Sequence, residues 1–152
     1  MRGFEKWISP ANMKPLHKTR GGYSDGKNEF LKTTWGAPDF IMPRKLNEID
    51  FLAKSFYEGR AAEYEQNLHL TFKTYNENEL EVRSSMVDEL LLSPDSRVLE
   101  VACGTGRDSE LICQRLSSSA ELHLVDISED MLKAAYKKLS ALRVDPKIFY
   151  CL

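Results

Sequence analysis

The fold is decided by residues 97–106, which read RVLEVACGTG. A short apolar run from Arg97 to Ala102 leads into a turn with glycines at 104 and 106, and a helical pattern carrying Leu111 follows. A short apolar run with turn formers at both ends predicts a buried strand. The segment therefore predicts a strand, a glycine turn and a helix in succession.

The same alternation continues to the end of the sequence. Leu122–Val125 predicts a second strand that ends at Asp126, Ser128 is placed to cap the next helix, and a third strand begins near Lys147. Strands that alternate with helices at this spacing imply right-handed crossovers and a parallel, doubly wound sheet. We therefore expect an α/β fold in which residues 96–152 form the first half of a Rossmann-like sheet, with its strands in the order 3-2-1.

Two regions precede this core. Residues 46–95 predict an N-terminal helical segment, with one helix from Leu46 to about Asn67 despite Gly59 and another from about Glu77 to Leu92. Residues 1–45 hold four of the six prolines and five of the eight glycines without a sustained period, and they predict an irregular, basic arm. The second helix is expected to have one apolar face, made of Leu80, Val82, Met86, Val87, Leu90 and Leu91.

Charge is divided unevenly along the chain. The net charge is −2, but residues 1–45 carry nine Lys and Arg against four Asp and Glu, whereas residues 46–152 carry twelve against nineteen. The basic residues are scattered without a dense cluster, so we do not expect nucleic-acid binding. No stretch has the roughly 18 apolar residues of a membrane span, and the N-terminus lacks the apolar core of a secretion signal. We expect a cytoplasmic protein that does not enter a membrane.

The glycine turn and Asp126, twenty residues beyond Gly106, carry the chemistry. Glycines just past a parallel strand let the backbone approach a ligand closely, and the N–H groups that begin the next helix point into the same space. An acid at the end of the second strand can accept hydrogen bonds from both hydroxyls of a ribose. Dinucleotides and S-adenosylmethionine both suit this arrangement.

Two residues favour S-adenosylmethionine. A carboxylate such as Glu100 at the end of the first strand would repel a pyrophosphate, but it suits a ligand with an α-amino group and a sulfonium. The dinucleotide fingerprint also requires a third glycine, and this chain has Ser109 after Gly104-Thr-Gly106-Arg-Asp. Both observations disfavour a dinucleotide-binding oxidoreductase.

The strings VLEVACGTGRD (98–108) and LHLVDISEDML (122–132) resemble the first two motifs of class I S-adenosylmethionine-dependent methyltransferases, especially the branch with the quinone-biosynthesis enzymes. By this resemblance, the carboxylate of Glu100 and both glycines would line the methionine part of the cofactor. Asp126 would hold the ribose, and Ile127 and Met131 would flank the adenine, although Met131 equally suits a place in the core. The implied cofactor site comprises Glu100, Ala102, Gly104, Thr105, Gly106, Asp126, Ile127 and Met131.

A looser resemblance lies upstream. Residues 56–64 are similar to the helical segment before the core in the same branch, where a tyrosine closes over the cofactor, so Tyr57 and Tyr64 are further candidates. Both tyrosines also suit simple packing within a helix. The sequence identifies no catalytic base and no metal site, because the cysteines form no C-x-x-C pair and have no histidine at metal-ligand spacing. We expect Cys103 to be a small buried residue.

The resemblance also implies that the second half of the fold would lie beyond Leu152. Strand 97–102 would then stand at the edge of the sheet with apolar side chains on both faces, and such an edge favours self-association. We expect a methyltransferase that acts on a small-molecule acceptor, present as a C-terminally truncated domain. The alternative is a non-catalytic binding or interaction protein that keeps the cofactor-binding half of the fold.

Overall fold

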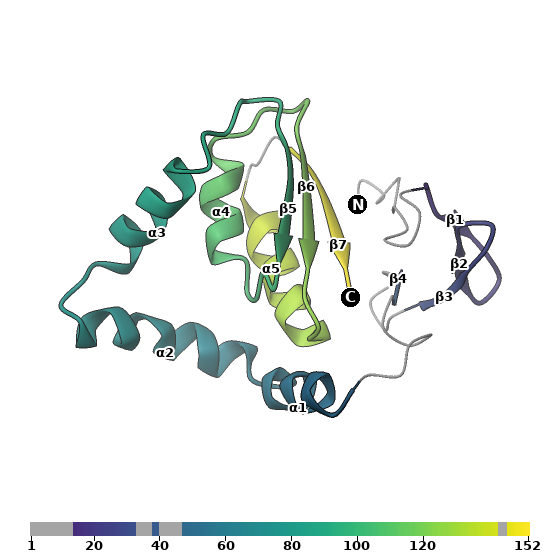
Figure 1. Cartoon of the computed structure of the whole chain (residues 1–152), viewed down its shortest axis with the longest axis horizontal. Helices are drawn as coiled ribbons and strands as arrows, with labels where there is room; N and C mark the ends of the chain where they lie inside the picture. The colour runs from purple at the N-terminus through teal and green to yellow at the C-terminus, as the bar shows by residue number, and fades with distance from the viewer. Residues whose placement is uncertain (1–13, 33–37, 40–46, 143–145) are drawn as a thin grey trace.

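The computed structural model describes residues 14–32, 38–39, 47–142 and 146–152, which form an α/β fold (Figure 1). One of its two sheets is parallel, with three strands in the order β5-β6-β7, which is the predicted order 3-2-1 read from the other side. The three strands are β5 (Arg97–Val101), β6 (Glu121–Val125) and β7 (Lys147–Cys151). The two connecting helices are α4 (Arg107–Cys113) and α5 (Glu129–Ala141). The predicted alternation of strand and helix over 96–152 is confirmed.

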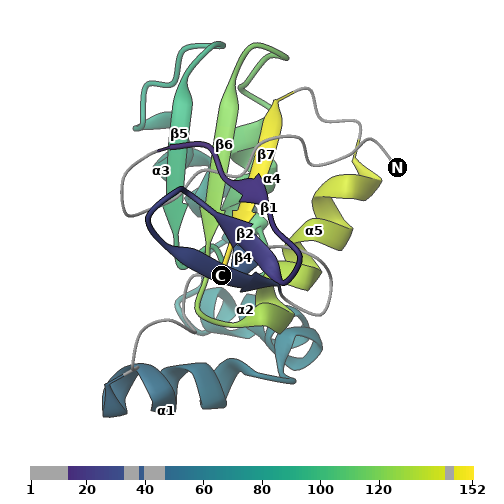
Figure 2. The same ribbon diagram turned by 90° about the vertical axis from the view of Figure 1, so that its right-hand side faces the viewer.

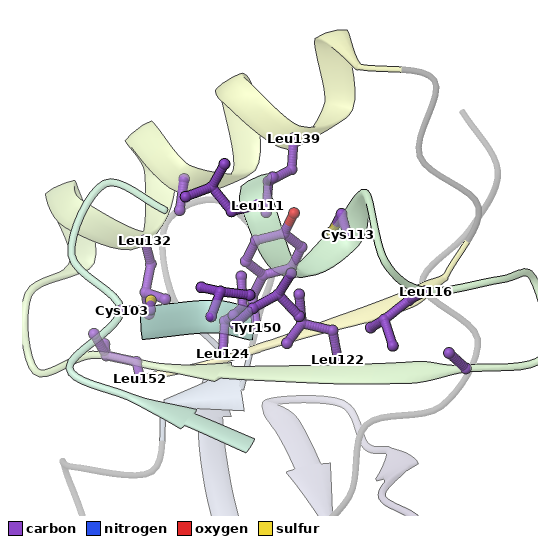
Figure 3. Close-up of a cluster of buried hydrophobic side chains, with 14 of the residues drawn as sticks. Cys103, Leu111, Cys113, Leu116, Leu122, Leu124, Leu132, Leu139, Tyr150 and Leu152 are labelled. Atoms are coloured by element: carbon purple, nitrogen blue, oxygen red, sulfur yellow. The ribbon is translucent and has the colours of Figure 1, made fainter. Parts of the chain in front are cut away.

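The core lies between this sheet and its two helices (Figure 3). Successive side chains of a strand point to opposite faces, so Leu122 and Leu124 of β6 share one face, and both are fully buried. Leu132 and Leu139 of α5 close over them. Complete burial of a leucine contributes about 1.5–3 kcal/mol, so this layer anchors the strand ends from which the turns project.

Ser128 begins α5 as the sequence predicts. Its side chain accepts a hydrogen bond from the backbone N–H of Met131 at 3.3 Å, and its own side chain is completely buried. This bond satisfies one of the free N–H groups at the start of the helix. The cap fixes the direction in which the chain leaves β6, directly after Asp126.

The N-terminal helical segment contains three helices, where the sequence predicts two. They are α1 (Glu48–Tyr57), α2 (Ala61–Thr74) and α3 (Glu79–Asp88). The prediction of a single helix through Gly59 is wrong. This glycine has a φ of +73°, a left-handed conformation that ends a helix. The carboxyl ends of the parallel strands point towards α1 and α2 (Figure 1).

The apolar face predicted for α3 is also wrong. Only Val87 of this helix is buried, whereas Leu80 and Met86 are more than 60% exposed. The helix contacts α4 through charged groups instead, because the Arg83 guanidinium donates to Asp108 at 2.7 and 2.8 Å. Its position therefore depends on an ion pair more than on burial of its apolar side chains.

The N-terminal arm is not irregular where the structure describes it. Residues 14–32 and 38–39 contain a small antiparallel sheet in the order β1-β2-β3-β4, so the prediction for this part is wrong. The strands are β1 (His17–Lys18), β2 (Gly22–Ser24), β3 (Glu29–Lys32) and β4 (Pro38–Asp39), too short to give a sustained alternation. The remainder of the predicted arm lies outside the described residues.

The antiparallel sheet packs through an aromatic pair. Tyr23 of β2 stands opposite Phe30 of β3, and both are buried. The turn between them is closed by the Asp25 side chain, which accepts hydrogen bonds from the N–H groups of Lys27 and Asn28 at 2.8 Å. Figure 2 shows this sheet on the opposite side of the parallel sheet from α4 and α5.

Strand β5 stands at the edge of the parallel sheet, as the sequence predicts. Leu99 and Val101 lie on the face that points away from α4, and they are 64% and 69% exposed. Among the described residues, no helix combines the length and apolar character needed to cross a membrane.

Candidate functional site

The turn between β5 and α4, residues 102–106, is built from left-handed backbone. Ala102, Gly104 and Gly106 have φ values of +59°, +54° and +77°. An alanine in this conformation costs about 1–2 kcal/mol, so the strain at Ala102 marks a backbone held by its surroundings. We call residues 102–106 the glycine turn.

The two glycines of this turn serve different purposes. A Cβ at Gly106 would lie 3.0 Å from the Cβ of Ala135, so the close approach of α4 to α5 excludes a side chain there. A Cβ at Gly104 would meet only a ring carbon of Tyr64, at 4.0 Å. Gly106 therefore packs two helices together, whereas Gly104 borders open space below α2.

Asp126 ties the glycine turn to the end of β6. Its Oδ2 accepts a hydrogen bond from the Gly104 N–H at 2.7 Å, and its Oδ1 accepts one from the Ser128 N–H at 2.9 Å. The residue is 8% exposed, and each carboxylate oxygen keeps a further lone pair. The structure thus brings together the two parts of the site that the sequence predicts from separate motifs.

Glu100 points towards α4 and is largely enclosed. Its Oε2 accepts a hydrogen bond of 2.7 Å from the Ser109 hydroxyl. Burial raises the pKa of Glu100 to about 7, with nearby Asp108 adding to the rise, although the bond from Ser109 opposes it. Ser109, which stands where a dinucleotide site requires glycine, is therefore the hydrogen-bond partner of the predicted acid.

Helix α2 covers the glycine turn with Tyr64. The Tyr64 ring lies beside Gly104, and the Tyr57 ring meets it edge-on with 6.3 Å between centroids. Burial raises the pKa of Tyr64 above its ordinary value. The upstream resemblance placed both tyrosines near the cofactor, and the structure brings Tyr64 to the turn with Tyr57 behind it.

Glu65 is a site residue that sequence reasoning missed. Its carboxylate accepts hydrogen bonds from the Thr105 hydroxyl and, at 2.7 Å, from the Lys138 ammonium. It also lies 3.2 Å from Nε of Arg107. Burial raises the pKa of Glu65, but the bonds from Lys138 and Thr105 outweigh this and hold it below its ordinary value. No local signal identifies this residue, because its partners come from α4, α5 and the turn.

The corner between α1 and α2 rests on the turn that follows β6. The Gly59 N–H donates to Asp130 Oδ2 at 2.6 Å, and the Lys54 ammonium donates to the carbonyl of Ile127 at 3.5 Å. Ile127 is half-buried, whereas Met131 is only 2% exposed and offers almost no surface to a ligand in this conformation. Of the two readings of Met131, this burial is typical of core packing.

Cys103 and His123, a thiol and an imidazole of the same region, are both held in packed surroundings. Cys103 is buried, and burial raises the pKa of its thiol well above the ordinary value, so it is a poor nucleophile. His123 stacks on Phe149 with 4.5 Å between ring centroids. Within the described ranges, no group of three His, Cys, Asp or Glu side chains is arranged to hold a metal ion.

Comparison with protein families gives a match over the segment that contains the glycine turn and Asp126. Residues 98–150 match the family described as "Methyltransferase domain". Over these residues, the chain is similar to proteins of that methyltransferase family. The match includes every predicted cofactor residue except Tyr57 and Tyr64, which lie on the helices before it.

Solved structures also show similarity to the chain. A crystal structure from Clostridium thermocellum, described as a "putative rRNA-methylase", is 18% identical with a TM-score of 0.41. The similarity covers 49% of this chain and 39% of that one, so the chain spans well under half of that protein's length. No curated protein matches the sequence.

Methyltransferases of this family generally use S-adenosylmethionine, and the site fits such a ligand. Gly104 borders space that a side chain would partly fill, and Asp126 beside it has lone pairs for hydroxyl donors. Glu100, near the carboxyl end of β5, supplies a carboxyl group suited to a ligand with positive charges.

Proposed function

We propose that this chain binds S-adenosylmethionine between the glycine turn and Asp126, and that it acts as the cofactor-binding part of a methyltransferase. The observation that carries the proposal is the 2.7 Å hydrogen bond from Gly104 to Asp126. It holds the backbone of one motif against the carboxylate of the other, at the carboxyl ends of parallel strands where α/β folds bind their ligands. The family match over 98–150 supports the same assignment.

Each residue of the site has a role in this proposal. Asp126 accepts the ribose hydroxyls through the lone pairs that Gly104 and Ser128 leave free. Glu100 balances the positive charge of the ligand, and Tyr64 covers the ligand from the side of α2. Ala102, Thr105 and Gly106 shape the backbone around it, and Ile127 borders the adenine, with the buried Met131 packed behind.

The chemistry of transfer comes from the cofactor, which supplies a methyl group on a sulfonium. The protein has to hold the acceptor and the sulfonium in line, and this positioning accounts for most of the catalysis that such a reaction needs. We assign no general base to the described residues. The enzymatic activity proposed for the chain therefore rests on cofactor binding and orientation.

The proposed acceptor is a small molecule. The chain has a net charge of −2 and 21 Lys and Arg against 23 Asp and Glu, so it lacks the positive field that attracts a phosphate backbone. Transfer of a tritiated methyl group from S-adenosylmethionine to fractionated cell extract tests this choice. Label in the small-molecule fraction supports the proposal, whereas label only in the RNA fraction contradicts it.

Cofactor binding is tested by calorimetry with S-adenosylmethionine, its demethylated product S-adenosylhomocysteine, and NADH. We expect the first two to bind and NADH to bind more weakly or not at all. Asp126→Asn should weaken binding by about tenfold or more, because hydrogen bonds to a charged acceptor contribute about 1.5–3 kcal/mol. Asp95→Asn is the matched control, because Asp95 is an exposed acid outside the site. Equal affinity in both variants, or preference for NADH, would contradict the proposal.

A further inference from the structure

Glu65 joins four separate parts of the structure. It lies on α2, it accepts the Thr105 hydroxyl of the glycine turn, and it faces Arg107 at the first position of α4. Lys138 reaches it from α5 at 2.7 Å. The backbone carbonyl of the same residue accepts a second bond from Arg107, at 2.9 Å. Glu65 therefore contacts both chain neighbours of Gly106, Thr105 and Arg107.

These polar contacts matter because α2 has little apolar anchorage. None of its 14 residues is buried. A helix without buried side chains gains little from the hydrophobic effect, so its place on the protein depends on its directed contacts. Glu65 makes the contacts of α2 with the glycine turn, and the next residue back along the chain is Tyr64.

Thr105 and Lys138 depend on Glu65 more than Arg107 does, because Arg107 also donates to Glu79 at 3.0 Å. Thr105 is 2% exposed. If Glu65 were removed, the Thr105 hydroxyl would lose a hydrogen bond that water cannot easily replace. Lys138 and Arg107 bring two positive charges to one carboxylate, which is about one-third exposed. Removing the carboxylate would deprive Lys138 of this ion pair, whereas Arg107 would keep its hydrogen bond to Glu79.

We propose that Glu65 is a positioning residue of the cofactor site, which fixes the glycine turn through Thr105 and Arg107 and keeps Tyr64 over Gly104. This role rests on the proposed function, because it concerns the same turn. Glu65 does not contact the cofactor in this account. It acts by holding the turn and its cover in one arrangement before the ligand arrives, which reduces the ordering that binding requires.

Two pairs of variants separate this role from general stability. Glu65→Ala removes the carboxylate, and Glu63→Ala removes an exposed carboxylate two residues away on the same helix. Thr105→Val removes the hydroxyl with little change of shape, whereas Thr105→Ser keeps it. The serine variant should therefore rescue what the valine variant loses.

The first measurement is amide hydrogen exchange in the free protein, which needs no ligand. We expect Glu65→Ala and Thr105→Val to increase exchange of the peptide amides over 102–107 and over α2. Exchange in β6 should stay unchanged, and Glu63→Ala and Thr105→Ser should resemble the wild type. Unchanged exchange over 102–107 in both loss variants would overturn the proposal.

The second measurement is the affinity for S-adenosylhomocysteine by calorimetry. Glu65→Ala and Thr105→Val should each bind about tenfold more weakly than their controls, and the double variant should bind no more weakly than the worse single one, because both remove one link. Wild-type affinity in the two loss variants would overturn the proposal while leaving the cofactor site intact. Absence of binding by the wild type would overturn the proposed function, and the positioning role with it. If Glu65→Ala fails to fold, the comparison of Thr105→Val with Thr105→Ser decides.

Discussion

The Ser109 hydroxyl donates a hydrogen bond of 2.7 Å to Glu100 Oε2. Ser109 is thus the hydrogen-bond partner of the Glu100 carboxyl group, which is enclosed between β5 and α4. Burial raises the pKa of Glu100 from 4.5 to about 7, so the folded protein holds a proton there that the unfolded chain releases at lower pH. Linkage therefore predicts that the stability contributed by this group is complete below pH 4.5 and is lost as the pH rises through 7.

Glu100→Gln tests this directly, because glutamine resembles the protonated acid. We expect the variant to exceed the wild type in free energy of unfolding at pH 8, by up to about 3 kcal/mol, and the difference to shrink towards pH 5. Urea unfolding at the two pH values measures it, with Glu63→Gln as the exposed control. A difference between variant and wild type that does not change with pH would show that Glu100 keeps an ordinary pKa.

The two glycines of the turn should respond differently to alanine. Gly106→Ala combines left-handed strain with a Cβ only 3.0 Å from that of Ala135, whereas Gly104→Ala adds the strain alone. We expect Gly104→Ala to lower the free energy of unfolding by about 1–2 kcal/mol. Gly106→Ala should lower it by about 1–3 kcal/mol more than Gly104→Ala does. Urea unfolding of both variants measures the difference. Adding Ala135→Gly to Gly106→Ala should recover part of the loss, and equal losses in the two single variants would contradict the packing role of Gly106.

The sequence was informative where the chemistry is local. The run 97–106 and the cap at Ser128 define their own elements, because a buried strand, a glycine turn and a helix cap depend on neighbouring residues. The register that brings Gly104 to Asp126 then follows from parallel pairing of β5 with β6. For this reason, two motifs that are separated along the chain could be predicted to lie side by side.

Other features depend on contacts that the sequence does not show. A glycine is tolerated in some helices, but Gly59 takes a left-handed φ of +73° after α1, and its N–H bonds to Asp130 on a distant helix. The role of Glu65 depends in the same way on Thr105, forty residues away. In the arm, strands of two to four residues give no period, although Asp25-Gly26 between Tyr23 and Phe30 was a usable hairpin signal.

The α1–α2 corner should loosen when its anchor on α5 is removed. None of the residues of α1 is buried, so the bond from Gly59 to Asp130 at 2.6 Å carries much of its attachment. We expect Asp130→Ala to increase amide exchange over residues 48–60 while leaving β6 protected. Glu129→Ala, at the neighbouring position of α5, is the control for loss of negative charge near the helix start. Equal exchange in the two variants would show that other contacts hold the corner.

The open edge of the parallel sheet should drive self-association. Leu99 and Val101 present apolar side chains on β5, at 64% and 69% exposure, and no strand of the described residues pairs with the outer edge of β5. Such an edge pairs readily with another strand, and a lysine on it opposes pairing through charge repulsion and desolvation. We expect the wild-type chain to sediment as concentration-dependent oligomers and Val101→Lys to shift it towards the monomer.

Leu31→Lys places the same charge on an exposed position of β3, in the other sheet, and should leave the distribution unchanged. Because Val101 is already exposed, its replacement should hardly alter the free energy of unfolding, so a change in sedimentation reports on the edge itself. A wild-type chain that stays monomeric over a hundredfold range of concentration would show that β5 is protected in some other way.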